Sequence, residues 1–129
     1  MNNELLDLVN YKVSRSKETL LEAETIFQAG FYNGAVNRMY YSCYYMVSAL
    51  LLLNNIKTQT HKGIRQQFGH HFIQTGIVSK EMGRYFSDLF DRRHTGDYDD
   101  FVICDKVTCS VLLTKANEFI SEVEKIVVS

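Results

Sequence analysis

The sequence predicts an all-α protein, an up-and-down bundle of four main helices and one shorter helix. Apolar residues recur at spacings of three and four along several long segments, as on one face of a helix. The chain contains no proline, the strongest interior helix breaker. No segment alternates with period two for long enough to require a strand. With 129 residues and neither an internal repeat nor a long linker, residues 1–129 are expected to form a single domain.

The segment from Phe31 to Asn54 is expected to be the central helix. Its run MYYSCYYMVSALLLL (39–53) is apolar or aromatic on nearly every side of a helix, so other elements must surround it. We expect no membrane span, because this run is shorter than the about 20 residues that a bilayer needs and is rich in tyrosine hydroxyls. Polar residues of the first turns are expected to enter the bundle beside the tyrosines, and function is expected near them: Asn33, Asn37 and Arg38.

A long helix is expected before the central one, and Gly30 is a natural stop between the two. Because the link is so short, the two helices should run antiparallel. The apolar stripe of this first helix is Leu6, Val9, Val13, Ser16, Leu20, Ala23 and Phe27.

A shorter helix should follow the turn at Asn54-Asn55, capped by Thr58 or Thr60 and ended by Gly76. His61 lies in its first turn, and its buried stripe is Ile64, Phe68 and Phe72.

Ser79 is expected to cap a fourth helix that runs from Lys80 to about Arg93. Its inward stripe ends on the Arg93 guanidinium, which would be costly to bury without a partner. We interpret residues 94–100 as a loop that carries three carboxylates. The stripe of the fourth helix is Met82, Phe86, Leu89 and Phe90. The last helix, roughly Ile103 to Val127, has the stripe Cys109, Leu112, Leu113, Ala116, Phe119, Ile120, Val123 and Ile126.

Composition excludes some classes of function. Lys and Arg number 14 against 15 Asp and Glu, so no global field attracts nucleic acid or an anionic membrane. Three cysteines form no paired framework, and the N-terminus has no signal peptide pattern, so we expect a cytoplasmic protein. His70 and His71 are adjacent and point to different faces, so we predict no metal site, and we expect no cofactor.

Three segments in this order resemble the HEPN domain: NRMYY (37–41), THKG (60–63) and RHTGDYD (93–99). More narrowly, the chain is similar to small stand-alone bacterial and archaeal HEPN proteins that carry Asn-Arg-x-Tyr-Tyr and Arg-x-x-x-Asp-Tyr-Asp segments. The resemblance covers essentially the whole chain. It implies a helical bundle, frequent homodimers and a minimal nucleotidyltransferase encoded nearby, as in a toxin and antitoxin pair.

Many members of the family resemble metal-independent ribonucleases, whose signature is an Arg, a polar residue and then a His a few positions on. This chain departs from that signature, because His94 adjoins Arg93 and no histidine follows it. Arg93 could stabilise negative charge but is always protonated, so a base would have to come from Asp97 or His61. Asp97 is the weaker base of the two at neutral pH.

We therefore expect a partner module that binds RNA or a nucleotide phosphate. One alternative is a metal-independent ribonuclease, and another is a non-catalytic structural or interaction module. The candidate catalytic residues are Arg93, Asp97 and His61, and the candidate ligand-binding residues are Asn37, Arg38, Tyr41 and Tyr98.

Each candidate also has a structural interpretation. Arg93 and Asp97 could form an ion pair that pins the end of the fourth helix, and Arg38 could bond Asp97 or Asp99 across the bundle. Tyr98 could be a packed aromatic residue, a base-stacking residue or an acceptor of an adenylyl group. Most tyrosines of the central helix, 40, 41, 44 and 45, should belong to the core or a dimer interface.

Overall fold

A computed structural model describes the backbone of residues 3–98 and 104–128, and the side chains of these residues except 94–98 and 128. The protein is an all-helical bundle, as predicted, with no strand in the part of the chain that the structure describes. Five α-helices and one π-helical turn follow one another: α1 Asn3–Gln28, α2 Tyr32–Leu53, α3 His61–Phe68, η1 Gly69–Ile73, α4 Lys80–Tyr98 and α5 Lys106–Val128.

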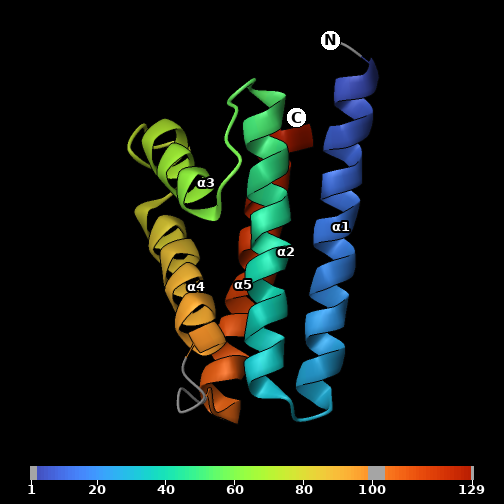
Figure 1. The fold of residues 1–129 in the computed structure, drawn as a ribbon, viewed down its shortest axis with the longest axis vertical. Coiled ribbons are helices and arrows are strands. Elements are labelled where there is room, and N and C mark those ends of the chain that lie inside the picture. Colours follow the sequence, from blue (N-terminus) through green and yellow to red (C-terminus); the bar gives the residue numbers. More distant parts are fainter. Residues whose placement is uncertain (1–2, 99–103, 129) are drawn as a thin grey trace.

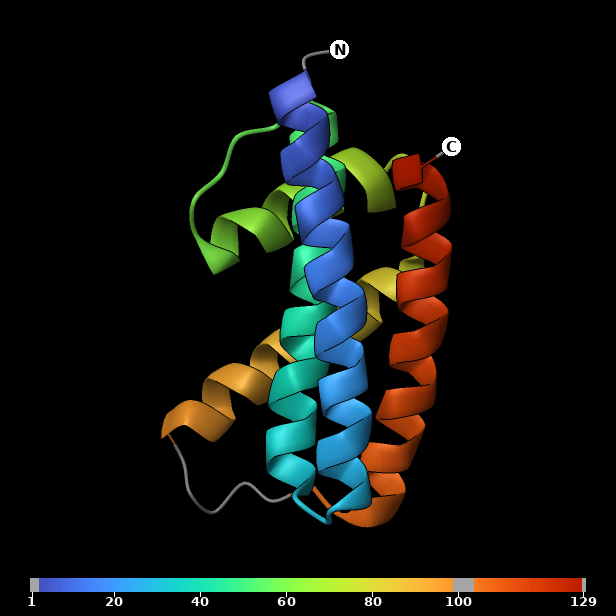
Figure 2. The ribbon, with the colours of Figure 1, turned by 90° about the vertical axis from the view of Figure 1, so that its right-hand side faces the viewer.

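The central helix is α2, which contacts α1, α3, α4 and α5. The long helices α1, α2, α4 and α5 alternate in direction along the chain (Figure 1). When the molecule is turned by 90°, α3 begins and α4 ends on the same side of α2 (Figure 2). This arrangement brings the first residue of α3 and the C-terminal half of α4 to one face of the central helix.

The interface between α1 and α2 contains a pair of buried serines. The Ser16 hydroxyl donates to the Ser42 carbonyl oxygen at 2.7 Å, and the Ser42 hydroxyl donates to the Ser16 carbonyl oxygen at 2.9 Å. The predicted stripe of α1 is correct at Val9, Val13, Ser16 and Ala23, which are buried. It is wrong at Leu6, which lies near the start of α1 and is 37% exposed.

The helix ends predicted from local signals are confirmed at several positions. Gly30 and Gly76 have positive φ angles of 88° and 80°, and Asn55 has a φ angle of 59°. Thr60 caps α3, because its hydroxyl oxygen accepts a hydrogen bond from the Gly63 amide at 2.9 Å. Ser79 caps α4 in the same way, through the Met82 amide.

Two predicted boundaries are wrong. The segment that we interpreted as a loop after Arg93 continues α4 as far as Tyr98. Once a helix is formed, each further residue adds one hydrogen bond, and no proline stops it here. The last helix begins at Lys106 instead of Ile103, because Asp105 is its N-cap: the carboxylate accepts a hydrogen bond from the Thr108 amide at 2.7 Å.

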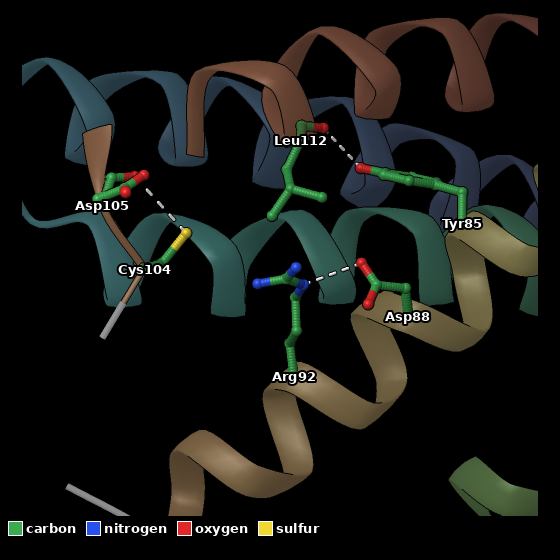
Figure 3. A network of polar contacts seen from close by, with 6 residues as sticks. All are labelled: Tyr85, Asp88, Arg92, Cys104, Asp105 and Leu112. Carbon is green, nitrogen blue, oxygen red and sulfur yellow. Dashed lines mark hydrogen bonds and ion pairs between the residues drawn. The ribbon is translucent and has the colours of Figure 1, made fainter. Parts of the chain in front are cut away.

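The core between α2, α4 and α5 is aromatic. Phe86 and Phe119 stack with ring centroids 5.8 Å apart, and Phe68 meets both edge-on. Tyr85 is also buried, although the predicted stripe of α4 omits it. Its hydroxyl donates to the Leu112 carbonyl oxygen at 2.7 Å, which joins α4 to α5 (Figure 3). A buried phenol therefore has the acceptor that it needs.

Candidate functional site

Side chains from three helices meet on the face of α2 where α3 begins and α4 passes. Three tyrosines come from α2, a histidine is the first residue of α3, and an arginine comes from α4. We call this group the tyrosine-arginine cluster: Tyr40, Tyr41, Tyr44, His61 and Arg93.

Helical spacing explains why these residues meet. Tyr40 and Tyr44 are one turn apart on α2, so their side chains lie on the same face, and Tyr41 flanks both. His61 follows the N-cap Thr60 directly, so the cap places its ring at the start of α3. Arg93 extends the inward stripe of α4 by one turn.

Tyr40 anchors the cluster in the core. Its side chain is fully buried, and its ring stacks on Phe86 at 6.0 Å. The hydroxyl lies 2.8 Å from the Nδ1 atom of His61, which is hydrogen-bonding distance. Burial raises the pKa of Tyr40 despite the opposing charge of Arg93, so the phenol keeps its proton. The cluster is therefore tied to the rigid centre of the bundle.

Arg93 is half-buried and is held by the tyrosines. Its Nη2 atom donates a hydrogen bond of 2.8 Å to the Tyr41 hydroxyl. Its guanidinium carbon lies 5.4 Å from the ring centroid of Tyr41 and 5.7 Å from that of Tyr40, within the range of cation–π attraction. The positive charge is thus positioned by neutral aromatic groups on α2.

His61 packs against Tyr44, with ring centroids 4.5 Å apart. Burial lowers the pKa of His61, and the positive charge of Arg93 lowers it further. Since the ordinary value is 6.5, the imidazole is neutral at pH 7. The site therefore combines one fixed cation, Arg93, with a neutral histidine.

The structure brings together three of the residues singled out in the sequence: Tyr41, His61 and Arg93. Asn37 is half-buried one turn before Tyr41 on α2. Arg38 is exposed and forms no hydrogen bond or ion pair with any described residue.

The predictions for the Asp97 and Tyr98 side chains fall outside the residues whose side chains are described, and Asp99 lies outside the described residues altogether. Sequence reasoning assigned Tyr40 and Tyr44 to the core or an interface and missed their place beside His61. Their spacing of four residues, next to Tyr41, was the available signal.

Away from the cluster, a hollow of about 240 Å³ lies between α4 and α5, and its charges are mixed. Arg84 and Lys115 line it together with Glu81, Asp88 and Glu118. The neighbouring Arg92 is paired with Asp88 at 2.9 Å (Figure 3). Carboxylates therefore accompany the cations in this hollow.

Among the described residues, no group of three His, Cys, Asp or Glu side chains could hold a metal ion. No helix within these residues is long and apolar enough to cross a membrane. The described side chains of the cluster offer hydrogen bonds, one positive charge and aromatic rings.

Comparison with known proteins places this geometry in context. A family model described as the HEPN domain matches residues 9–126. A UPF0332 protein of Thermotoga maritima is 34% identical over 125 residues, which cover 97% of this chain and 95% of that protein. A protein of Methanocaldococcus jannaschii, named as a candidate toxin, is 32% identical over 117 residues (91% and 80%). A second protein of that organism, also named as a candidate toxin, is 26% identical over 128 residues (97% and 92%).

Proposed function

The chain belongs to the HEPN domain family, and from this premise we propose that it binds RNA or a nucleotide through a phosphate at the tyrosine-arginine cluster. The observation that carries the proposal is the position of Arg93, half-buried and bonded to the Tyr41 hydroxyl at 2.8 Å. A guanidinium matches the geometry of a phosphate and can donate two parallel hydrogen bonds to it. Tyr41, Tyr44 and His61 are half-buried, so their rings could offer a surface on which a base stacks.

We also propose that the protein is the toxin-like member of a cytoplasmic two-component module. The two relatives from Methanocaldococcus jannaschii named as candidate toxins support this role. Resemblance to the family implies a minimal nucleotidyltransferase as the partner, which would act together with the HEPN chain.

We further propose that the protein is a homodimer. Val107 and Val111 lie one turn apart on α5 and are 74% and 50% exposed, so an apolar strip of this helix is uncovered in the single chain. Light scattering coupled to size-exclusion chromatography measures the mass in solution. A mass of twice 14.9 kDa is expected, and a monomer at micromolar concentration would contradict the dimer.

A second candidate function, metal-independent ribonuclease, has its own observation. His61 has a lowered pKa and is neutral beside a cation, the condition in which a histidine can accept a proton from a 2′-hydroxyl group. Asp97 is the other candidate base. This function requires cleavage of RNA in the presence of EDTA.

One experiment tests the binding proposal. A fluorescent 5′-phosphorylated oligoribonucleotide is titrated with protein in EDTA, and anisotropy and strand integrity are followed together. Arg93→Gln should weaken binding about tenfold or more, because it removes a charge-assisted contact. Arg92→Gln is the matched control, since Arg92 is adjacent to Arg93 but lies outside the tyrosine-arginine cluster, where it contacts Asp88.

Equal affinities of the Arg93→Gln variant and the wild type would overturn the binding proposal. RNA cleavage that Arg93→Gln abolishes would favour the ribonuclease. Circular dichroism and a thermal melt of each variant show that it is folded.

A further inference from the structure

We infer that Tyr40 holds His61 in one tautomer, so that the imidazole acts as an N–H donor to the ligand's phosphate and not as a base. The tautomer of His61 follows from the ligand-free structure alone. The role of His61 as a donor to phosphate rests on the proposed function. Tyr40 is in this account a positioning residue, which acts through His61.

The first step concerns the proton of the Tyr40 hydroxyl. Tyr40 is fully buried, so bulk water does not reach its side chain. Within the part of the chain that the structure describes, the only hydrogen-bond partner of this hydroxyl is the Nδ1 atom of His61, at 2.8 Å. A buried donor without an acceptor costs free energy, so the hydroxyl donates its proton to Nδ1.

The second step concerns the two nitrogens of His61. In the reverse arrangement, Nδ1 would donate to the phenolic oxygen, and the phenol proton would have no acceptor. Nδ1 must therefore carry the lone pair, and a neutral imidazole then carries its single proton on Nε2. The in-plane directions of Nδ1 and Nε2 diverge, so Nε2–H is not directed at the Tyr40 hydroxyl, and it forms no hydrogen bond with a described residue.

The third step concerns protonation of His61. The charged and titratable groups that face it among the described side chains are Tyr40, Tyr41 and Tyr44 of α2 and Arg93 of α4. None of them is an anion at neutral pH, and Arg93 repels an imidazolium. Protonation would also take from Tyr40 its acceptor. The geometry thus keeps His61 neutral, in agreement with the lowered pKa.

The chemical class of the ligand follows from these steps. Arg93 and the Nε2–H group of His61 are both donors, so together they suit an acceptor with several oxygens, such as a phosphodiester or a terminal phosphate. They do not suit removal of a proton from a 2′-hydroxyl group, because the lone pair of Nδ1 is occupied and Nε2 already carries a hydrogen. In this cluster, His61 is a binding residue.

Nitrogen NMR of the ligand-free protein tests the tautomer directly. Long-range ¹H–¹⁵N correlation spectra of protein labelled in its four histidines separate protonated from unprotonated ring nitrogens, and His61→Gln assigns the His61 signals. We expect an unprotonated Nδ1 and a protonated Nε2 at pH 7. The opposite tautomer, or a mixture of both in the wild type, would overturn the inference whether or not the protein binds RNA. In Tyr40→Phe we expect the mixture to appear and the pKa of His61 to rise.

Binding of the 5′-phosphorylated oligoribonucleotide tests the role of the donor. His61→Leu should weaken binding about tenfold, because it removes one hydrogen bond to a charged group. His61→Gln should keep most of the wild-type affinity. A glutamine amide can accept a hydrogen bond from Tyr40 through its oxygen and donate one to the ligand through its nitrogen. Glutamine cannot serve as a base, so failure of His61→Gln to restore binding would contradict the donor role. Absence of binding by the wild type would refute the proposed function and leave the tautomer to the NMR result.

Discussion

Removal of the Tyr41 hydroxyl is a conservative perturbation of the proposed phosphate site. Tyr41→Phe keeps the ring, the helix and the charge of Arg93, and deletes only the oxygen that accepts the 2.8 Å hydrogen bond from Nη2. Arg93 is half-buried, so water can replace part of the lost bond. We therefore expect a loss of about 0.5–1.5 kcal/mol in the free energy of unfolding.

The same change should lower affinity for the oligoribonucleotide. Without the Tyr41 hydroxyl, the arginine side chain loses one of the contacts that order it, and restoring this order when the ligand binds costs about 0.5–1.5 kcal/mol. This corresponds to a dissociation constant raised about two- to tenfold. Fluorescence anisotropy measures the affinity, and urea denaturation measures the stability.

Tyr32→Phe is the matched control for this prediction. Tyr32 is another half-buried tyrosine of α2, it lies far along the helix from the cluster, and its hydroxyl bonds no described residue. The affinity of the Tyr32→Phe variant for the oligoribonucleotide should equal that of the wild type. An unchanged affinity in Tyr41→Phe would refute the positioning of Arg93 by Tyr41. A loss as large as that of Arg93→Gln would also refute it, because the hydroxyl itself would then contact the ligand.

Three further predictions concern the fold that supports the site. Ser16→Ala and Ser42→Ala should each lower the free energy of unfolding by about 1 kcal/mol, because each deletes a buried hydrogen bond between α1 and α2. Urea denaturation measures this loss, and an unchanged stability of Ser16→Ala would contradict it. Tyr85→Phe should lower the free energy of unfolding by about 1 kcal/mol, because it deletes the hydrogen bond to α5. RNA affinity should stay unchanged, and a change in affinity would contradict the independence of this contact from the tyrosine-arginine cluster. Asp105→Ala should lower the free energy of unfolding through loss of the α5 cap, whereas Asp105→Asn should lower it less, and equal losses would refute capping.

The architecture could be predicted from the sequence because its signals are local. A helix that is apolar on nearly every side has to be central, and α2 is indeed surrounded by the other helices. Gly30, Thr60 and Ser79 mark helix ends through backbone freedom and side-chain capping, and the structure confirms each of them. These signals depend on a few neighbouring residues, so no tertiary information is needed to interpret them.

The boundaries that were predicted wrongly depend on competing local preferences. Gly96 and the acidic residues after Arg93 have the composition of a loop, yet helix propagation carries α4 to Tyr98. At the other end of this connection, the Asp105 cap moves the start of α5 to Lys106. Composition alone does not show which preference is the stronger.

The candidate site could be predicted only in part. Inward helical spacing indicated that Arg93 would be enclosed, and the resemblance to the family indicated His61. The bond between Tyr40 and His61 joins residues 21 positions apart, so it depends on how α3 returns to α2 after the turn. Four tyrosines between positions 40 and 45 predict a core helix equally well, which is why the sequence did not assign Tyr40 to the site.

Mapping of a bound ligand onto the chain tests whether the phosphate binds at the tyrosine-arginine cluster. Backbone amide and side-chain ¹⁵N spectra of the wild type are recorded during titration with the 5′-phosphorylated oligoribonucleotide. We predict saturable shifts centred on the start of α3, the tyrosines of α2 and the Arg93 guanidinium. Saturable shifts confined to the hollow between α4 and α5, with the signals of His61 and Arg93 unchanged, would contradict the account.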